Sequence, residues 1–180
     1  MKTAVPWKEP LSEPAHPTEL YHAIQQLIEE HEQLKLLIQA LEEKARQAAL
    51  SRDTEEQLKA LRDLKVDTVQ LMTQMNRHSS WEEQVLYPFL HEYFDLSMGP
   101  SMVPSFWVLE KDHDLAEAYM DSFIDAVEDL ASPGERRQLQ SVAEHLLQAC
   151  RILSGHLAME EQLVYPLSDQ VLTDVDYFFS

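Results

Sequence analysis

Glycine and cysteine are scarce in this sequence of 180 residues. Three glycines leave few positions for the tight turns of a strand-rich fold, whereas the helix-favouring residues Leu, Ala, Glu and Gln are abundant. The single cysteine, Cys150, has no partner for an internal disulfide. A chain of this length forms one core more readily than two. We therefore expect a single all-α domain built from long helices.

Positive charge is also scarce. Lys and Arg number 14 against 32 Asp and Glu, which gives a formal net charge of −18. Nucleic acids and anionic membrane surfaces attract proteins through clustered Lys and Arg, so neither is an expected partner. Residues 1–17 contain four prolines but no apolar run that resembles a signal peptide or a membrane span. These absences predict a soluble, cytoplasmic protein.

Apolar residues recur every three or four positions in four stretches, which is the pattern of helices with one buried face. Prolines and glycines interrupt the pattern at residues 97–105 and 132–134. The expected helices cover about residues 18–50, 53–94, 106–127 and 139–169. They predict an up-down-up-down four-helix bundle over residues 18–170, with a Pro-rich arm at 1–17 and an acidic and aromatic tail at 171–180.

Two segments of the chain repeat each other. They are His78-Ser-Ser-Trp-Glu82-Glu-Gln-Val-Leu-Tyr87-Pro88 and His156-Leu-Ala-Met-Glu160-Glu-Gln-Leu-Val-Tyr165-Pro166. Each places an imidazole four residues before a carboxylate, and in an α-helix this spacing puts both side chains on one face. Two such helices facing each other can hold a pair of metal ions. The prolines at equivalent positions indicate loosened helices with a common local geometry.

Four histidines fall within apolar stripes, one on each expected helix: His31, His78, His113 and His156. A single buried histidine is more often a hydrogen-bonded core residue than a ligand. Together with inward-facing Glu82 and Glu160, however, the set leaves several buried polar groups without partners unless metal ions satisfy them. A metal-free helical interaction module, with the histidines hydrogen-bonded in the core, is the alternative.

The chain resembles the hemerythrin-like family, also called the HHE cation-binding domain, over about residues 18–170. That family carries a histidine on the first and third helices and a histidine–carboxylate pair on the second and fourth, as this chain does. The resemblance implies that Glu82 and Glu160 bridge two iron ions, with an oxo or hydroxo group completing the bridge. It also implies that O2 or NO binds at an open coordination position. Mixed imidazole and carboxylate ligation also suits zinc or manganese.

The third helix departs from the oxygen-carrying hemerythrins, which have a second histidine where this chain has Glu117. Whether Glu117 or His22 is an additional ligand is left open, and the departure weakens the case for reversible oxygen carriage. Two carboxylates, fewer than in ferritin-like sites, leave the cluster more positive and favour the ferrous state. This points to binding or sensing before oxygenase chemistry. No nucleophile triad or phosphate-binding glycine loop supports a hydrolase or a kinase, and enzymatic turnover is left open.

Residues near the predicted ligands have supporting roles in this interpretation. Glu83 and Glu161 are expected beside the ligands or at the surface. Tyr87 and Tyr165 are expected to pack under the end of the bundle, with phenol hydrogen bonds to the cluster as the alternative. The tryptophans and methionines near the site, Trp107 among them, are expected to form a dry lining.

The sequence thus predicts a non-haem di-iron protein that binds O2 or NO, or that responds to iron and redox state. A second hypothesis, suggested by the family, is delivery of iron to an iron-acceptor protein whose iron–sulfur or di-iron centre is damaged. The apolar segment of residues 98–107 either covers an entry path to the site or forms the contact of a homodimer.

Overall fold

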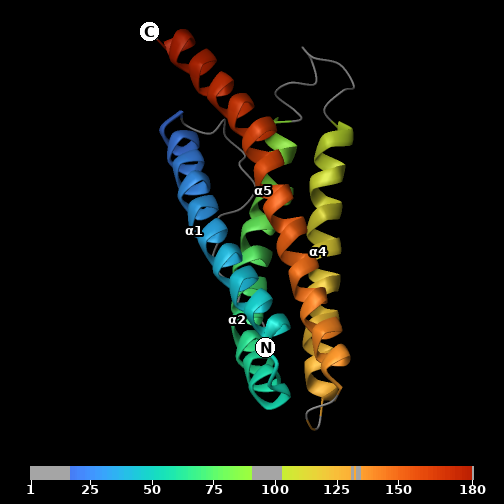
Figure 1. Ribbon diagram of the computed structural model, residues 1–180. Helices are drawn as coiled ribbons and strands as arrows, with labels where there is room; N and C mark the ends of the chain where they lie inside the picture. The colour runs from blue at the N-terminus through green and yellow to red at the C-terminus, as the bar shows by residue number, and fades with distance from the viewer. Residues whose placement is uncertain (1–16, 91–102, 131, 133–134, 180) are drawn as a thin grey trace, which may run out of the picture.

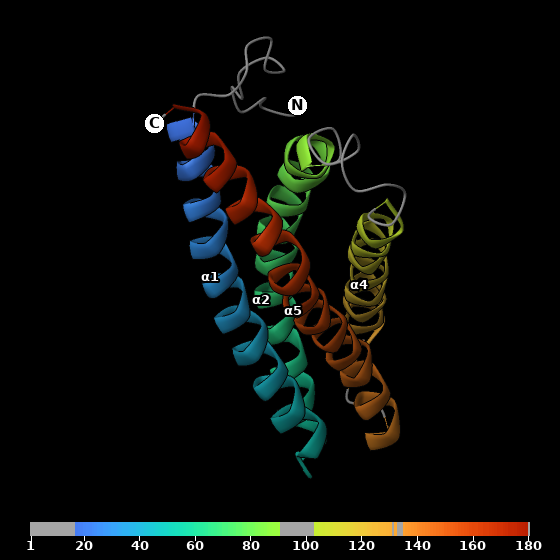
Figure 2. The ribbon, with the colours of Figure 1, turned by 90° about the horizontal axis from the view of Figure 1, so that it is seen from above.

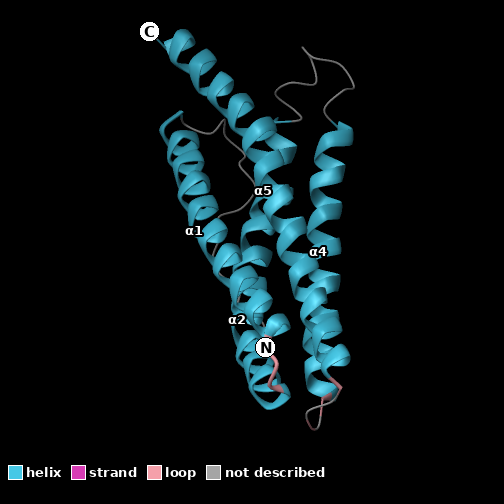
Figure 3. Ribbon diagram, in the orientation of Figure 1, coloured by secondary structure: helices cyan, strands magenta, loops and turns pink. Residues whose placement is uncertain are grey.

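The computed structural model describes residues 17–90, 103–130, 132 and 135–179. It contains α1 (Pro17–Leu50), α2 (Thr54–Trp81), the π-helical turn η1 (Glu82–Leu86), α4 (Val103–Asp129) and α5 (Arg136–Phe179). Residues 87–90 continue the helix beyond η1. These residues are helical almost throughout (Figure 3), and the described part of the chain contains no strand, as the sequence predicts.

Successive helices run in opposite directions and form a bundle (Figure 1, Figure 2). α1 and α4 each pack against both α2 and α5. Asp53 caps the start of α2, because its carboxylate accepts hydrogen bonds from the backbone N–H groups of Glu55 and Glu56 at 2.9 and 3.3 Å. The architecture is therefore the predicted all-α, up-down-up-down bundle.

The predicted start of the third helix is wrong. Pro104 does not delay α4, which begins at Val103. Proline is tolerated in a first helical turn because its missing N–H group has no partner within the helix there. The predicted end of the second helix near residue 94 and residues 98–102 of the apolar segment lie outside the described residues.

The predicted end of the fourth helix near Asp169 is also wrong. α5 has 44 residues, passes through Pro166 and continues to Phe179, into the segment expected to be a tail. Pro166 and Gln162 are exposed, so water can solvate the carbonyl group of Gln162 that proline leaves without a donor. Although α5 is long, none of the described helices is apolar enough over a sufficient length to cross a membrane.

Two apolar clusters fill the bundle, and a layer of polar side chains separates them along every helix. The larger cluster includes Leu34, Met75, Ala116 and Leu153, and the smaller one includes Leu27, Leu86, Leu109 and Val164. In sequence, each predicted ligand lies between a residue of one cluster and a residue of the other. Packing of the four helices therefore places these polar groups in the interior.

Candidate metal centre

All six predicted ligands come together in the layer between the two apolar clusters. They are His31 on α1, His78 on α2, Glu82 at the start of η1, His113 on α4, and His156 and Glu160 on α5. Five of them are at most 2 % exposed, and the side chain of His113 is 9 % exposed. The prediction that all four histidines face the interior is confirmed.

One group of donors, formed by His31, His78, Glu82 and Glu160, lies within 4.8 Å. Nε2 of His31 is 3.5 Å from Oε1 of Glu82 and 3.2 Å from Oε2 of Glu160. Nε2 of His78 is 2.8 Å from the same oxygen of Glu82. Two imidazole nitrogens and two carboxylate oxygens from different helices therefore surround one point in the core.

A second group, formed by Glu82, His113 and His156, also lies within 4.8 Å. The ring centroids of His113 and His156 are 4.1 Å apart. Nε2 of His156 is 3.2 Å from Oε2 of Glu160, which connects this group to the first one. Glu82 belongs to both groups, so its carboxylate connects them.

The inward-facing donor atoms lack hydrogen-bond partners in the described part of the chain. These atoms are Nε2 of the four histidines, Oε1 of Glu82 and Oε2 of Glu160. The nitrogens of His31, His78 and His156 lie 2.8–3.5 Å from these carboxylate oxygens, but they are not aligned to donate to them. Two ligands at about 2.1 Å from one ion and at right angles are roughly 3 Å apart. The donor set therefore fits metal ions, which would satisfy these buried atoms.

Carboxylates on the outer side of two histidines orient the imidazole rings. Oε2 of Glu30 is 3.2 Å from Nδ1 of His78, and Oε1 of Glu83 is 3.1 Å from Nδ1 of His113. An ionised carboxylate only accepts hydrogen bonds, so each Nδ1 carries the hydrogen and donates it. Metal-binding histidines are typically held this way, with the other nitrogen toward the ion. The expected place of Glu83 beside the ligands is confirmed.

Sequence reasoning missed Glu30. It adjoins His31 in the chain, but it contacts His78 on the neighbouring helix and accepts a hydrogen bond of 3.1 Å from Arg77. No local spacing signals a contact between two helices. Glu161 has a looser position, because its Oε1 is 4.0 Å from Nδ1 of His31 and also pairs with Lys35.

Opposite charges meet in the first group. Burial disfavours a charge on His78, but the neighbouring Glu30 and Glu82 outweigh it and raise the pKa of His78 to about 10. Burial also disfavours a charge on His31, but Glu160 and Glu82 outweigh it and raise the pKa of His31. The hydrogen bond with His78 lowers the pKa of Glu30 to about 2. Protons on the imidazoles therefore balance the buried carboxylates, and a bound cation would replace those protons.

His113 in the second group behaves differently. Burial and the neighbouring His156 lower its pKa to about 4, although the hydrogen bond with Glu83 acts in the opposite direction. The ring is therefore neutral near pH 7, with its hydrogen on Nδ1. Its Nε2 then carries a free lone pair.

The two repeated segments differ in backbone conformation, although their sequences are similar. Glu82–Leu86 forms a π-helical turn, in which the N–H group of Tyr87 donates to the carbonyl oxygen of Glu82. The equivalent residues of α5 remain α-helical. The expectation of a common local geometry is therefore wrong. A π turn holds one residue more than an α turn, so it rotates the side chains beyond it relative to those before it.

This difference gives the two equivalent tyrosines different surroundings. Tyr87 is 3 % exposed, and its hydroxyl group donates to Oε1 of Glu160 and lies 3.5 Å from Oε2 of Glu82. Tyr87 therefore contacts the carboxylate oxygens that do not face the histidines. The hydroxyl of Tyr165 is buried and has no hydrogen-bond partner among the described residues, and its ring centroid is 5.4 Å from that of His31. For Tyr87, the alternative of a phenol hydrogen bond to the cluster is therefore correct, and packing alone does not describe its role.

Phenylalanine in place of Tyr87 is expected to lower the free energy of unfolding of the metal-free protein by about 1.5–3 kcal/mol. The change removes a buried hydrogen bond to a charged group. Tyr165→Phe is the matched control and is expected not to lower the free energy of unfolding, because its hydroxyl has no hydrogen-bond partner to lose among the described residues. Urea denaturation measures both variants. Equal changes in the free energy of unfolding in the two variants would contradict the different roles of Tyr87 and Tyr165.

The other residues considered as ligands lie apart from these two groups. His22 is exposed on α1, and Oε1 of Glu117 accepts a hydrogen bond from Nδ2 of Asn76 at 3.4 Å. Among the described residues, neither belongs to a group of metal donors. Trp107 is 58 % exposed, so its expected role in a dry lining is wrong.

The fold and the site define a class of protein, a four-helix bundle with a histidine–glutamate cluster in its core. A family model described as the hemerythrin HHE cation binding domain matches residues 22–167. The chain belongs to this family, and the predicted resemblance is confirmed. Comparison with curated proteins and with solved structures found no significant match.

Proposed function

We propose that the chain is a non-haem di-iron protein that binds O2 or NO, or that responds to iron and redox state. The layer of six buried side chains whose inward-facing atoms lack hydrogen-bond partners carries this proposal. Membership of a cation-binding family supports metal at this place. The proposed ligands are His31, His78, Glu82, His113, His156 and Glu160.

The proposal gives the two carboxylates bridging roles. Glu82 bridges the ions because it belongs to both donor groups. Glu160 is the second bridge, because its Oε2 is 3.2 Å from Nε2 of both His31 and His156. When bound, the ions supply the open coordination position at which a diatomic ligand binds. Four neutral imidazoles beside two carboxylates leave the pair of ions with excess positive charge, which favours the ferrous state.

Metal analysis and absorption spectroscopy test this proposal. Untagged protein from iron-supplemented cells is expected to hold two irons per chain, one for each donor group, with charge-transfer absorption that changes on exposure to oxygen. Zinc or manganese at the same stoichiometry after aerobic and anaerobic iron loading would refute the choice of iron. Absence of metal after anaerobic reconstitution with ferrous iron would refute the metal centre and favour a metal-free interaction module.

A second candidate function is delivery of iron to an acceptor protein. A polar pocket beside the second donor group favours it, because an accessible ion exchanges more readily than an enclosed one. This function predicts that bound iron moves to an apo acceptor protein. Iron that stays bound in competition with such an acceptor would count against it.

A further inference from the structure

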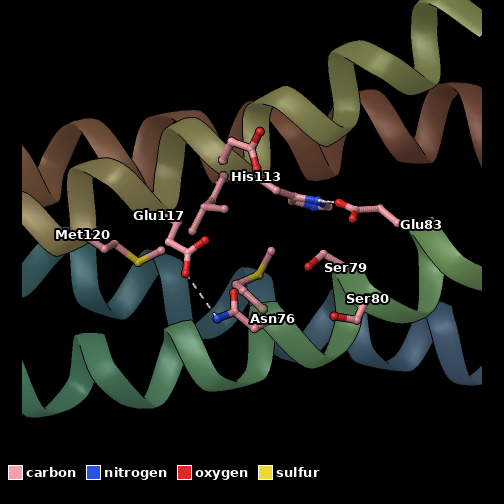
Figure 4. A pocket seen from close by; sticks show the side chains of 10 residues that line it. Asn76, Ser79, Ser80, Glu83, His113, Glu117 and Met120 are labelled. Carbon is pink, nitrogen blue, oxygen red and sulfur yellow. Dashed lines mark hydrogen bonds and ion pairs between the residues drawn. The ribbon is translucent and has the colours of Figure 1, made fainter.

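A pocket of about 270 Å³ lies between α2 and α4, on the side of the bundle where His113 belongs to the second donor group (Figure 4). Its wall includes Asn76 and Ser79 from α2 and Glu117 from α4. A water molecule occupies roughly 30 Å³ in the liquid, so the pocket has room for several. It therefore holds enough space for a small hydrated ion.

The wall of this pocket carries negative charge. Glu83, Asp114 and Glu117 are among its lining residues, and none of the described lining residues is Lys or Arg. Lys111, outside the lining, pairs with Asp114 and offsets its charge. Glu83 and Glu117 therefore supply the net negative charge of the wall. The hydrogen bond from Asn76 to Glu117 spans the gap between α2 and α4 (Figure 4). The remaining polar side chains of the wall are neutral donors or acceptors of hydrogen bonds. A space of this kind attracts cations and repels anions.

His113 connects the pocket to the centre. Its imidazole forms part of the wall and extends from α4 toward Glu83, which orients it (Figure 4). Its Nε2 is buried and has no hydrogen-bond partner in the described segments, and its ring centroid lies 4.1 Å from that of His156. The imidazole of His113 thus forms the boundary between the pocket and the second donor group. Glu117 stands four residues after His113, one helical turn along the same face of α4.

The chemistry of the wall favours a cation over the diatomic ligands. O2 and NO are neutral and gain little from carboxylates, whereas a divalent cation gains from each one. Carboxylate, amide and hydroxyl groups can also replace hydrogen bonds to the water that the cation carries.

We propose that this pocket is the passage through which a hydrated divalent cation enters and leaves the centre, with Glu117 as the carboxylate that receives it. The inference rests on the proposed function, because it requires a metal in the centre. Nε2 of His113, one turn before Glu117 on α4, would then replace a water molecule bound to the ion. Glu117 remains a residue of the passage and is not a ligand of the final centre.

Uptake kinetics of the full-length apo protein test this passage, with Co2+ as an absorbing probe and Fe2+ under anaerobic conditions. Glu117→Gln is expected to slow uptake by about 3- to 10-fold, with the same final two ions per chain as the wild type. Asn76→Lys, which places a cation at the pocket, is expected to slow uptake by more than about 10-fold. Asp121→Asn is the matched control, because it removes one charge at an exposed position of α4 and is expected to leave the rate unchanged.

The outcomes separate the passage from the centre itself. Wild-type rates in both pocket variants would overturn the passage while leaving the metal centre in place. A lower final stoichiometry in Glu117→Gln would make Glu117 a ligand and would also overturn the assignment. Failure of the wild-type protein to take up either ion would refute the proposed function, and the passage with it. Circular dichroism of each apo variant verifies that the bundle is intact.

Discussion

Alanine in place of Glu82 is expected to abolish the dinuclear centre. Glu82 is the one side chain that both donor groups share, so its loss leaves three donors in the first group and two in the second. Loss of residues that merely orient a metal ligand typically costs 10- to 100-fold in affinity. Loss of a carboxylate ligand shared by two ions should cost more than about 100-fold. Equilibrium dialysis followed by metal analysis measures this loss directly.

The corresponding change at Glu160 is expected to be milder. Glu160 belongs to the group of four donors and reaches the group of three only through its contact with His156, so Glu160→Ala leaves the three donors of the second group in place. We expect this variant to lose less metal affinity than Glu82→Ala, which leaves one of the two groups with only two donors. Gln84→Ala is the matched control, because Gln84 lies in the same π-helical turn with an exposed side chain. Two ions bound in both glutamate variants would refute the bridging roles. Equal losses of metal affinity in the two variants would contradict the proposal that Glu82 serves both donor groups and Glu160 mainly one.

Removal of the metal is expected to lower the melting temperature by roughly 15–30 °C. An ion present at about 1,000 times its Kd stabilises the folded state by about 4 kcal/mol, and the proposal contains two ions. One kcal/mol shifts the melting temperature of a chain of this size by about 2–4 °C. The stabilisation arises because the ions satisfy buried atoms that have no hydrogen bonds within the part of the chain that the structure describes.

Calorimetry with and without a chelator checks this expectation. The Glu82→Ala protein is the control, since a variant without the centre should melt at the same temperature in both conditions. A metal-free interaction module predicts no effect of the chelator on the wild-type protein. A shift below about 3 °C, less than one kcal/mol, would therefore contradict the metal centre. The contacts of His31 and His78 with carboxylates should keep the apo bundle folded at low temperature.

The helical class and the convergence of the six donors follow from local sequence patterns. A histidine and a carboxylate four residues apart share a helix face whatever the rest of the chain does, and an apolar stripe on either side directs that face inward. Such patterns are less reliable at helix ends. Pro104 and Pro166 are signals for a break, but one lies in a first turn and the other on an exposed face, where water replaces the lost hydrogen bond.

Contacts between helices decided the surroundings of the donors. Tyr87 and Tyr165 occupy equivalent positions in the two repeats, and only the π turn at Glu82–Leu86 sends the hydroxyl of Tyr87 to Glu160. Glu30 has no sequence signature, because its partner His78 lies 48 residues away on another helix. The polar pocket likewise exists only where α2 and α4 meet.

The sequence by itself determined which faces of the helices are buried and which donor types lie on them. That information is local, since the helical repeat converts spacing along the chain into position around an axis. The tertiary structure decided which donors lie close to one another, which tyrosine contacts the carboxylates and where the polar pocket lies. These features depend on the relative rotation and distance of neighbouring helices, which packing of the whole bundle sets and no short segment encodes.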